Sequence, residues 1–337
     1  MLPDSTSFDL IGVGSPIMDL LAPVSEAFLA RVGGAKGGMV LVDQREMQRI
    51  LSLLEREPVC TTGGSAANTT LNGARLGLRT TFLGKLGNDE LDRTYRRRFE
   101  AAGVDARRFK TAPLPNARCL ALVTPDAQRT MRTCLAAAMT LAPTDFSPAD
   151  FRDCRHAHVE GYLVFNQALA DAVLDSARAA GCTVSLDLAS FEVVNASRDW
   201  LLGQLRRGID VVFANEDEIR ALFQDRDSDY AALARRLASL GVLAAVKVGK
   251  DGAWLAHGDI LSRVPPVVVS DLVDTNGAGD AWAAGFLYGH LRGWPLAACG
   301  ALASMMGAET VRHLGPIIPE ASWASVLARA MALAPAP

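Results

Sequence analysis

The sequence lacks long apolar runs, and its opposite charges nearly cancel. No uninterrupted apolar run reaches the roughly 18 residues that a membrane-spanning helix needs, and the richest region, 278–306, is broken by Asp280, His290, Arg292 and Pro295. The 34 Lys and Arg residues face 37 Asp and Glu residues, which gives a formal charge of −3. A chain so balanced has no electrostatic footprint for nucleic acid or an anionic membrane. We therefore expect neither partner and favour a small-molecule ligand.

Cysteine is also scarce, and linkers and repeats are absent. The six cysteines form no C-x-x-C pair, and the start "MLPDSTSFDL" has no secretory signal, so we expect reduced thiols in a cytoplasmic protein. No Pro/Ser-rich linker, internal repeat or low-complexity tract divides the 337 residues, half of which are apolar. A core of that size predicts one large domain over residues 1–337.

Apolar and amphipathic segments alternate from residue 156 onward. The strand-like runs are "HAHVEGYLV", "CTVSLDL", "IDVVFA" and "VLAAVKVG", and segments such as "ALADAVLDSARAAG" between them have helical spacing. "FDLIGVG" and "TTFLGKLG" read as further buried strands. This alternation predicts a three-layer α/β/α fold with a mostly parallel central sheet.

Two regions do not fit the alternation. "KGGMVLVD" follows a Gly-rich approach, and "ARCLALVTPDAQRTMRTCLAAA" has a Pro-Asp turn between two strand-like runs. We expect them to form a small discontinuous β lid, approximately residues 15–45 and 108–135. Because ligands of open parallel sheets bind beyond the carboxyl ends of the strands, the residues that follow each apolar run are the candidates for function.

The stretch "VDTNGAGDAW" places small residues before an acid and an Ala-rich helical run. Gly277, Ala278 and Gly279 leave the backbone N–H groups open at a predicted helix start, where an anion is favoured. Asp280 would lie in the first turn and face that anion, a position suited to taking a proton from an attacking hydroxyl. The alternative is a plain turn with Asp280 as a capping acid, which is less favoured because the motif is longer than a turn requires.

A second glycine-rich segment, "TTGGSAANTTLNGARLG", also precedes a predicted helix. Gly63 and Gly64 allow close backbone approach, and the amide of Asn68, about one turn into the helix, can bond a polyhydroxylated ligand. Asp19, after the first strand, can accept two hydroxyls of a diol. The structural alternatives are a helix start capped by Ser65 and a helix cap at Asp19.

Three further positions have both a functional and a structural interpretation. Asn215 and Glu218 in "NEDE" share a helix face, where the carboxylate can hold the outer shell of hydrated Mg²⁺; the alternative is a solvated acidic helix start. Arg129, in the predicted lid, can close over phosphates or remain a surface residue. His156 and His158 share a strand face, but no carboxylate or cysteine at suitable spacing supports a metal site there.

These segments resemble the signatures of a known family. "DTNGAGDAWAAGFLYG" and "GGSAANTTLNGARLG" are similar to the two signature segments of the ribokinase-like carbohydrate kinases, over about residues 10–319. "DTNGAGD", "GSPIMDL" and "RTMRTCLAAA" look most like the adenosine kinase branch. Ser15 stands where adenosine kinases commonly carry Asn, and Asp92 where the family often has Gly; the first departure puts adenosine itself in question.

The resemblance implies roles for individual residues. The catalytic base of the family matches Asp280, and the positions around the transferred phosphoryl group match Gly277, Ala278, Gly279 and Arg129. The acceptor-binding positions match Asp19, Gly63, Gly64 and Asn68, and the nucleotide-binding positions match Asn215, Lys247, Gly249 and Gly252. A water-mediated Mg²⁺ contact matches Glu218, and a K⁺-binding loop matches Asp274 and Asn276.

The resemblance therefore implies an ATP-dependent, Mg²⁺-requiring kinase that phosphorylates a primary hydroxyl of an adenosine-like nucleoside or a small sugar. K⁺ would be a further cofactor, and the chain would act as a monomer or homodimer. Two alternatives stay open: a sugar kinase of the ribose, fructose or 2-keto-3-deoxygluconate type, and a non-catalytic sugar or nucleotide sensor. A P-loop is excluded because Ser or Thr follows neither Gly-Lys pair, and a dinucleotide motif fails at Ile17.

Overall fold

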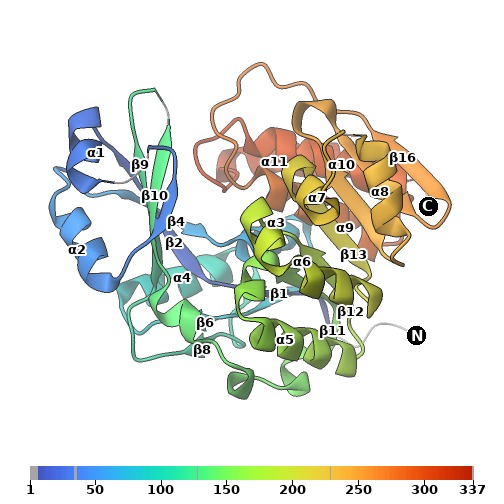
Figure 1. Ribbon diagram of the computed structural model, residues 1–337, viewed down its shortest axis with the longest axis horizontal. Helices are drawn as coiled ribbons and strands as arrows, with labels where there is room; N and C mark the ends of the chain where they lie inside the picture. Colours follow the sequence, from blue (N-terminus) through green and yellow to red (C-terminus); the bar gives the residue numbers. More distant parts are fainter. Residues whose placement is uncertain (1–6, 34–35, 127, 228, 336–337) are drawn as a thin grey trace.

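A nine-stranded sheet forms the centre of the computed structural model, which describes residues 7–33, 36–126, 128–227 and 229–335 (Figure 1). Neighbouring strands of this sheet are parallel, except that β15 runs antiparallel to β14 and β16. In spatial order the strands are β16 (Ile260–Val264), β15 (Ala253–His257), β14 (Leu243–Lys247), β13 (Val211–Asn215), β12 (Thr183–Asp187), β11 (Cys154–Glu160), β1 (Phe8–Val13), β5 (Thr80–Leu83) and β7 (Val104–Asp105).

Helices cover both faces of this sheet because its inner strands are apolar on both sides. In β13, Val212 and Ala214 pack into the core of one helical layer, whereas Val211 and Phe213 pack into the other. The first layer contains α5 (Gln167–Ala179), α6 (Phe191–Arg206), α7 (Glu216–Phe223) and α8 (Tyr230–Ala238); the second contains α3 (Ser65–Leu76), α4 (Glu90–Ala101), α9 (Ala278–Leu291), α10 (Leu296–Thr310) and α11 (Glu320–Leu333). The predicted three-layer α/β/α fold is confirmed.

A five-stranded sheet stands beside the main body, at the left of Figure 1. Its order is β3 (Met39–Leu41), β10 (Arg129–Cys134), β9 (Ala117–Val123), β2 (Ile17–Pro23) and β4 (Val59–Gly63). One face packs on α1 (Glu26–Val32) and α2 (Gln44–Ser52) through an apolar cluster that includes Leu20, Leu29 and Ile50. We call it the small sheet.

The small sheet draws strands from both segments predicted as a lid, 15–45 and 108–135, and adds β4, which lies outside them. Residues 110–111 form β8 (Lys110–Thr111), which pairs instead with β6 (Lys85–Leu86). Short 3₁₀ turns complete the chain: η1 (Ala136–Thr140), η2 (Pro143–Asp145), η3 (Pro148–Phe151), η4 (Gly161–Phe165) and η5 (Gly249–Asp251). Within the described ranges, no helix has both the length and the apolar character required to cross a bilayer.

Four parallel strands of the main sheet end side by side with a polar residue. The register pairs Glu160 of β11 with Asp187 of β12, and Asn215 of β13 with Lys247 of β14. The carboxyl edge of the sheet therefore collects two acids, an amide and a lysine, next to the start of α9.

Candidate active site

The start of α9 has the open backbone that its sequence predicts. Gly277 caps the helix with φ 73°, and a Cβ there would lie 2.4 Å from the Cβ of Pro316. A Cβ at Gly279 would lie 3.3 Å from Lys247 Nζ. The first N–H groups of a helix have no intrahelical acceptor and carry partial positive charge. Together with the lysine ammonium, they make a seat for an anion.

Asp280 is held from α3. Ser65 Oγ donates to its Oδ1 at 2.8 Å and Asn68 Nδ2 donates to its Oδ2 at 2.9 Å, while Thr69 Oγ1 donates to its backbone carbonyl at 3.2 Å. The N-cap of α3 is Gly64, and Ser65 does not cap the helix. Asp280 is therefore oriented by donors from another helix.

Burial raises the pKa of Asp280 to about 6. The hydrogen bonds from Asn68 and Ser65 and the charge of Lys247 oppose this effect, whereas Asp187 adds to it. A carboxylate with a pKa near neutrality is suited to accept a proton in a catalytic step.

Two acids at the carboxyl edge were missed by the sequence analysis. Asp187 Oδ2 accepts from Lys247 Nζ at 3.1 Å, and Glu160 accepts from the backbone N–H groups of Ser15 at 2.8 Å and Ala66 at 3.3 Å. Burial raises the pKa of Glu160 to about 7. Asp187 lies next to the end of the run "CTVSLDL", where the strand-end rule could have found it. Glu160 lies inside the run "HAHVEGYLV", and only the structure shows that its strand ends there.

Asn215 and Glu218 form a reciprocal capping box at the start of α7. The Asn215 side chain accepts from the Asp217 and Glu218 N–H groups, and Glu218 Oε2 accepts from the Asn215 N–H at 2.8 Å. Glu218 is buried, and its pKa is raised to about 7 by that burial and by Asp187, against the opposing charge of Lys247. The residue is thus both a helix cap and a member of the acidic cluster.

The glycines predicted to face a nucleotide shape the turn after β14. Gly249 has φ 48° and Gly252 has φ 92°. At Gly252 a Cβ would lie 2.1 Å from the carbonyl oxygen of Val264, so a side chain there would break the close packing of this turn against β16.

Asp19 lies in β2, in the small sheet, rather than capping a helix. It packs on Gly63, where a Cβ would lie 2.4 Å from the Asp19 Cγ. Burial raises the pKa of Asp19 to about 7; Arg129 lowers it and Asp280 raises it. The small sheet therefore brings Asp19 and Arg129 into the same electrostatic environment as Asp280.

Arg129 forms an ion pair with Asp274 across the space between β10 and the loop before α9. Asp274 is buried and also accepts from the Gly315 N–H at 2.6 Å and, at 3.1 Å, from the Asn276 N–H. The ion pair joins the small sheet to the main body. With it, the Asp274 carboxylate accepts hydrogen bonds from Arg129, Gly315 and Asn276.

His156 and His158 are buried and hydrogen bonded. His156 contacts the hydroxyls of Thr183 and Ser185, and His158 contacts Ser185, each at 2.8 Å. Burial lowers the pKa of both rings, so they are neutral core residues. Across the described segments, no cluster of three or more His, Cys, Asp or Glu side chains is arranged to hold a metal ion.

Asp92, a departure from the family pattern, lies in α4 and pairs with Arg96 at 2.9 Å.

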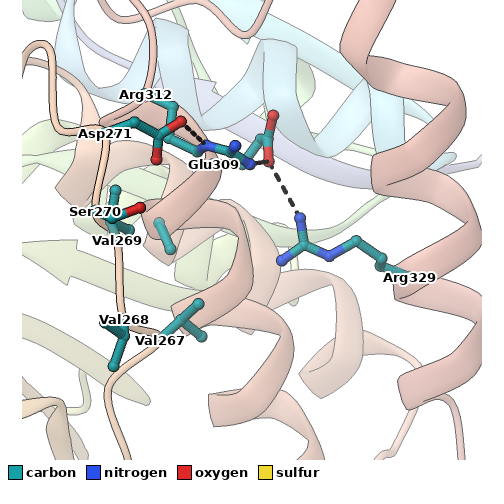
Figure 2. Close-up of a pocket in the computed structure, with 9 residues that line it drawn as sticks. Val267, Val268, Val269, Ser270, Asp271, Glu309, Arg312 and Arg329 are labelled. Atoms are coloured by element: carbon teal, nitrogen blue, oxygen red, sulfur yellow. Dashed lines mark hydrogen bonds and ion pairs between the residues drawn. The ribbon is translucent and has the colours of Figure 1, made fainter.

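A cavity of about 350 Å³ lies beside the start of α9 (Figure 2). It is lined by residues 267–271 and by Ala308, Glu309, Arg312 and Arg329. The neighbouring Gly307 packs α10 on α9, since a Cβ there would lie 3.4 Å from the Ala278 carbonyl oxygen. Asp280, Asp187, Glu160 and Glu218 do not line this cavity.

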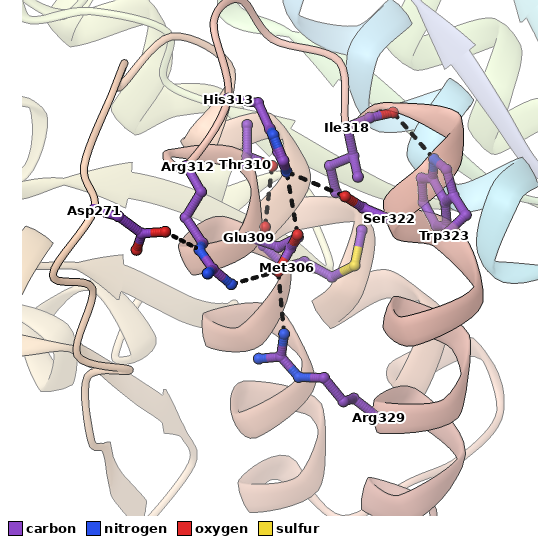
Figure 3. Close-up of polar contacts among 10 residues, drawn as sticks. All are labelled: Asp271, Met306, Glu309, Thr310, Arg312, His313, Ile318, Ser322, Trp323 and Arg329. Atoms are coloured by element: carbon purple, nitrogen blue, oxygen red, sulfur yellow. Dashed lines mark hydrogen bonds and ion pairs between the residues drawn. The ribbon is translucent and has the colours of Figure 1, made fainter.

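A polar network fixes the walls of this cavity (Figure 3). Glu309 is buried and contacts His313 Nε2 at 3.1 Å, Arg329 at 3.1 Å and Arg312 at 3.5 Å. Arg312 also reaches Asp271 at 2.8 Å. The loop that leads to the glycine motif is thereby tied to α10 and α11.

Fold and site together define a phosphotransferase that acts on a sugar or nucleoside hydroxyl. A family model described as pfkB family carbohydrate kinase matches residues 37–323, and the chain belongs to this family. The resemblance read from the sequence is confirmed, as are the enzyme class and the likeness to adenosine kinases.

Two solved structures and one further relative, all similar to this chain, are sugar or adenosine kinases. Adenosine kinase from Sinorhizobium meliloti superposes with a TM-score of 0.86 at 32% identity, covering 96% of this chain and 100% of that one. A probable sugar kinase from Rhizobium etli gives 0.84 at 30% identity, covering 98% and 100%. Adenosine kinase from Saccharomyces cerevisiae is 26% identical, covering 92% of this chain and 96% of its own.

Proposed function

We propose that the protein is an ATP-dependent kinase that phosphorylates the primary hydroxyl of a nucleoside, with Asp280 as the general base. The observation that carries this proposal is the placement of Asp280 in the first turn of α9, between donors from α3 and the ammonium of Lys247. Its raised pKa of about 6 supports the role of proton acceptor.

The acceptor would bind between Asp19 and Asn68. Asn68 Nδ2 is engaged by Asp280, but its Oδ1 is buried with no hydrogen-bond partner in the structure. A buried amide oxygen without a donor is costly, and a substrate hydroxyl would supply that donor. Asp19, packed on Gly63, would accept a second hydroxyl of the same ligand.

The inner face of the small sheet favours a nucleoside over a free sugar. Strand pairing aligns Leu21, Ala121, Met131 and Met39 in one row, next to the row that contains Asp19. Met39 is 51% exposed. An apolar surface beside the diol site would pack against a flat base, whereas a sugar alone would leave it in water. Sugar phosphorylation stays the alternative, since Asp19 and Asn68 serve either acceptor.

The residues present fit a bound nucleotide and a divalent cation. The cavity by residues 267–271 would take the nucleoside part of ATP, and the α9 start with Lys247 would take its phosphates. Mg²⁺ commonly uses one or two carboxylates together with substrate phosphates and water, and Asp187 and Glu218 supply such carboxylates. This arrangement agrees with the lack of a closed side-chain metal cage in the part of the chain that is described.

A monovalent cation would rest on backbone carbonyls of the loop around Asp274 and Asn276. The Asp274 carboxylate already accepts from Arg129 and Gly315, so its side chain would be a poor direct ligand. K⁺ is thus proposed to act by ordering the loop.

The mechanism follows from these positions. Asp280 would accept the hydroxyl proton as the acceptor oxygen attacks the γ-phosphorus; the bond from that phosphorus to the β,γ-bridging oxygen would break, and ADP would leave with the electron pair of that bond. The N–H groups of Gly279 and its neighbours, with Lys247, stabilise the charge on the transferred group. Bound Mg²⁺ would neutralise part of the phosphate charge. The small sheet, acting as a lid, excludes water while Arg129 exchanges Asp274 for the phosphate.

A coupled ADP-release assay tests this function. Mg-ATP is offered with adenosine, inosine, cytidine, ribose, fructose and 2-keto-3-deoxygluconate, with and without K⁺. We expect the nucleosides to give the highest kcat/KM. A preference for a sugar would move the assignment to the sugar kinases, and no ADP formation with any acceptor would favour the non-catalytic sensor.

A further inference from the structure

Glu160 is a buried carboxylate with no cation beside it in the described structure. It is 1% exposed, and it forms no ion pair with Lys, Arg or His. Instead, its two oxygens accept backbone N–H groups from segments far apart in the sequence: Oε1 from Ser15 and Oε2 from Ala66. An ionisable group kept in such a place without a countercharge is costly, so a specific role is expected for it.

The first of these segments connects the two sheets. Residues 14–16 lead from β1 of the main sheet directly into β2 of the small sheet. This connection is closely packed. A Cβ at Gly14 would lie 2.2 Å from the Glu160 side chain at Oε2, one at Gly64 would lie 2.3 Å from the Ser15 carbonyl oxygen, and one at Gly84 would lie 2.6 Å from the Gly14 carbonyl oxygen. Residues 14–16 are one of the chain connections between the main body and the small sheet, so motion of the small sheet would act on them.

The second segment holds the base. Ala66 is the second residue of α3. Ser65 just before it and Asn68 two residues after it donate to Asp280. Glu160 therefore touches the same helical turn that orients Asp280, through the main chain of that turn.

We propose that Glu160 is a positioning residue that fastens the connection between the two sheets at Ser15 to the first turn of α3, and so couples closure of the small sheet to the orientation of Asp280. The proposal rests on the proposed role of Asp280. Glu160 itself would not contact the reacting atoms; it would set where two backbone segments lie when the substrate is enclosed.

Three variants test the coupling. Glu160→Ala removes both acceptors, Glu160→Gln keeps the shape and one acceptor oxygen, and Asp92→Asn is the control, because it changes another buried acid that lies in α4 outside the site. Hydrogen exchange with mass spectrometry follows peptides that cover residues 14–24 and 64–70. Steady-state kinetics then give kcat and both KM values.

For Glu160→Ala we expect exchange to rise about tenfold in these two segments, as for one lost hydrogen bond, and not in α5 or α8. The acceptor KM should rise about tenfold and kcat should fall, while the ATP KM changes less than twofold. Glu160→Gln should recover part of each change. Asp92→Asn should leave the two segments and the acceptor KM as in the wild type, whatever its effect on Tm.

The opposite pattern would overturn the coupling. It would do so if exchange in the two segments stayed at the wild-type rate, if it rose uniformly over the chain, or if both KM values rose together. The exchange measurement needs no substrate, so it judges the fastening even if no acceptor is phosphorylated. In that case the proposed kinase function fails separately.

Discussion

The acid limb of the pH profile is the sharpest consequence of how Asp280 is held. As the proposed base, Asp280 must be ionised to accept a proton, and its pKa is raised to about 6 because burial outweighs the donors from Asn68 and Ser65. Activity should therefore be lost as pH falls through about 6. One pH unit below the pKa, roughly a tenth of the carboxylate is ionised, so kcat/KM at pH 5 should be about tenfold below its plateau.

Removing one donor should move this limb. Ser65→Ala deletes the hydrogen bond to Asp280 Oδ1 and leaves Asn68 on Oδ2. A hydrogen bond to a charged group contributes about 1.5 kcal/mol, and one pKa unit corresponds to about 1.4 kcal/mol. Because the lost bond favours the ionised form, the limb should rise from about 6 to about 7.

The assay is kcat/KM for the best acceptor between pH 5 and pH 9, measured for the wild type, Ser65→Ala, Asp280→Asn and Ser25→Ala. Ser25 caps α1, the helix that packs on the small sheet, so this variant controls for loss of a serine hydroxyl. Asp280→Asn should lower kcat by about 10² to 10⁴ and abolish the limb. A limb that stays at the wild-type position in Ser65→Ala, or that persists in Asp280→Asn, would refute Asp280 as the group observed, since Asp19 and Glu218 titrate nearby.

Four further outcomes can be measured. Ala308→Trp should fill much of the cavity beside α9 and raise the ATP KM by tenfold or more, with little change in the acceptor KM; equal changes in both would place the nucleotide elsewhere. Arg129→Lys should lower kcat several-fold, because Arg129 is proposed to contact the transferred phosphate, whereas Asp274→Asn removes only the partner of Arg129 before transfer and should lower kcat less; equal losses of kcat in the two variants would contradict the exchange. Met131→Ser should lower kcat/KM for a nucleoside by about 5- to 30-fold, from apolar burial of about one to two kcal/mol, and leave kcat/KM for ribose unchanged; an equal loss for both acceptors would argue against binding of the nucleobase on the small sheet. Glu160 has its pKa raised from 4.5 to about 7, so its contribution favours the folded state below 4.5 and is lost as pH rises toward 7. The free energy of unfolding of the wild type relative to Glu160→Gln, from urea titrations, should thus fall by about 3 kcal/mol between pH 4.5 and pH 7, and a difference that does not change with pH would contradict the shift.

The local pattern of the chain was enough to predict the architecture and the two glycine-rich segments. Buried parallel strands are apolar on both faces, and helices between them keep their own period, so alternation along the sequence specifies the layers. Likewise, Gly277 and Gly279 predict accessible backbone N–H groups at a helix start. This prediction needs only the local sequence, because it depends on the lack of side chains there and not on a distant residue.

The tertiary structure alone decided which groups meet. Ser65 and Asn68 reach Asp280 across 215 and 212 residues of sequence, and Arg129 finds Asp274 across 145. Glu160 and Asp187 become neighbours only through the parallel register of β11 and β12. Local propensity acts over about a turn of helix or a strand, whereas the pKa of Asp280 depends on burial and on charges carried by other elements. The sequence therefore singled out Asp280 as the proposed base, whereas the packing of α3 on α9 orients that carboxyl and its burial raises its pKa.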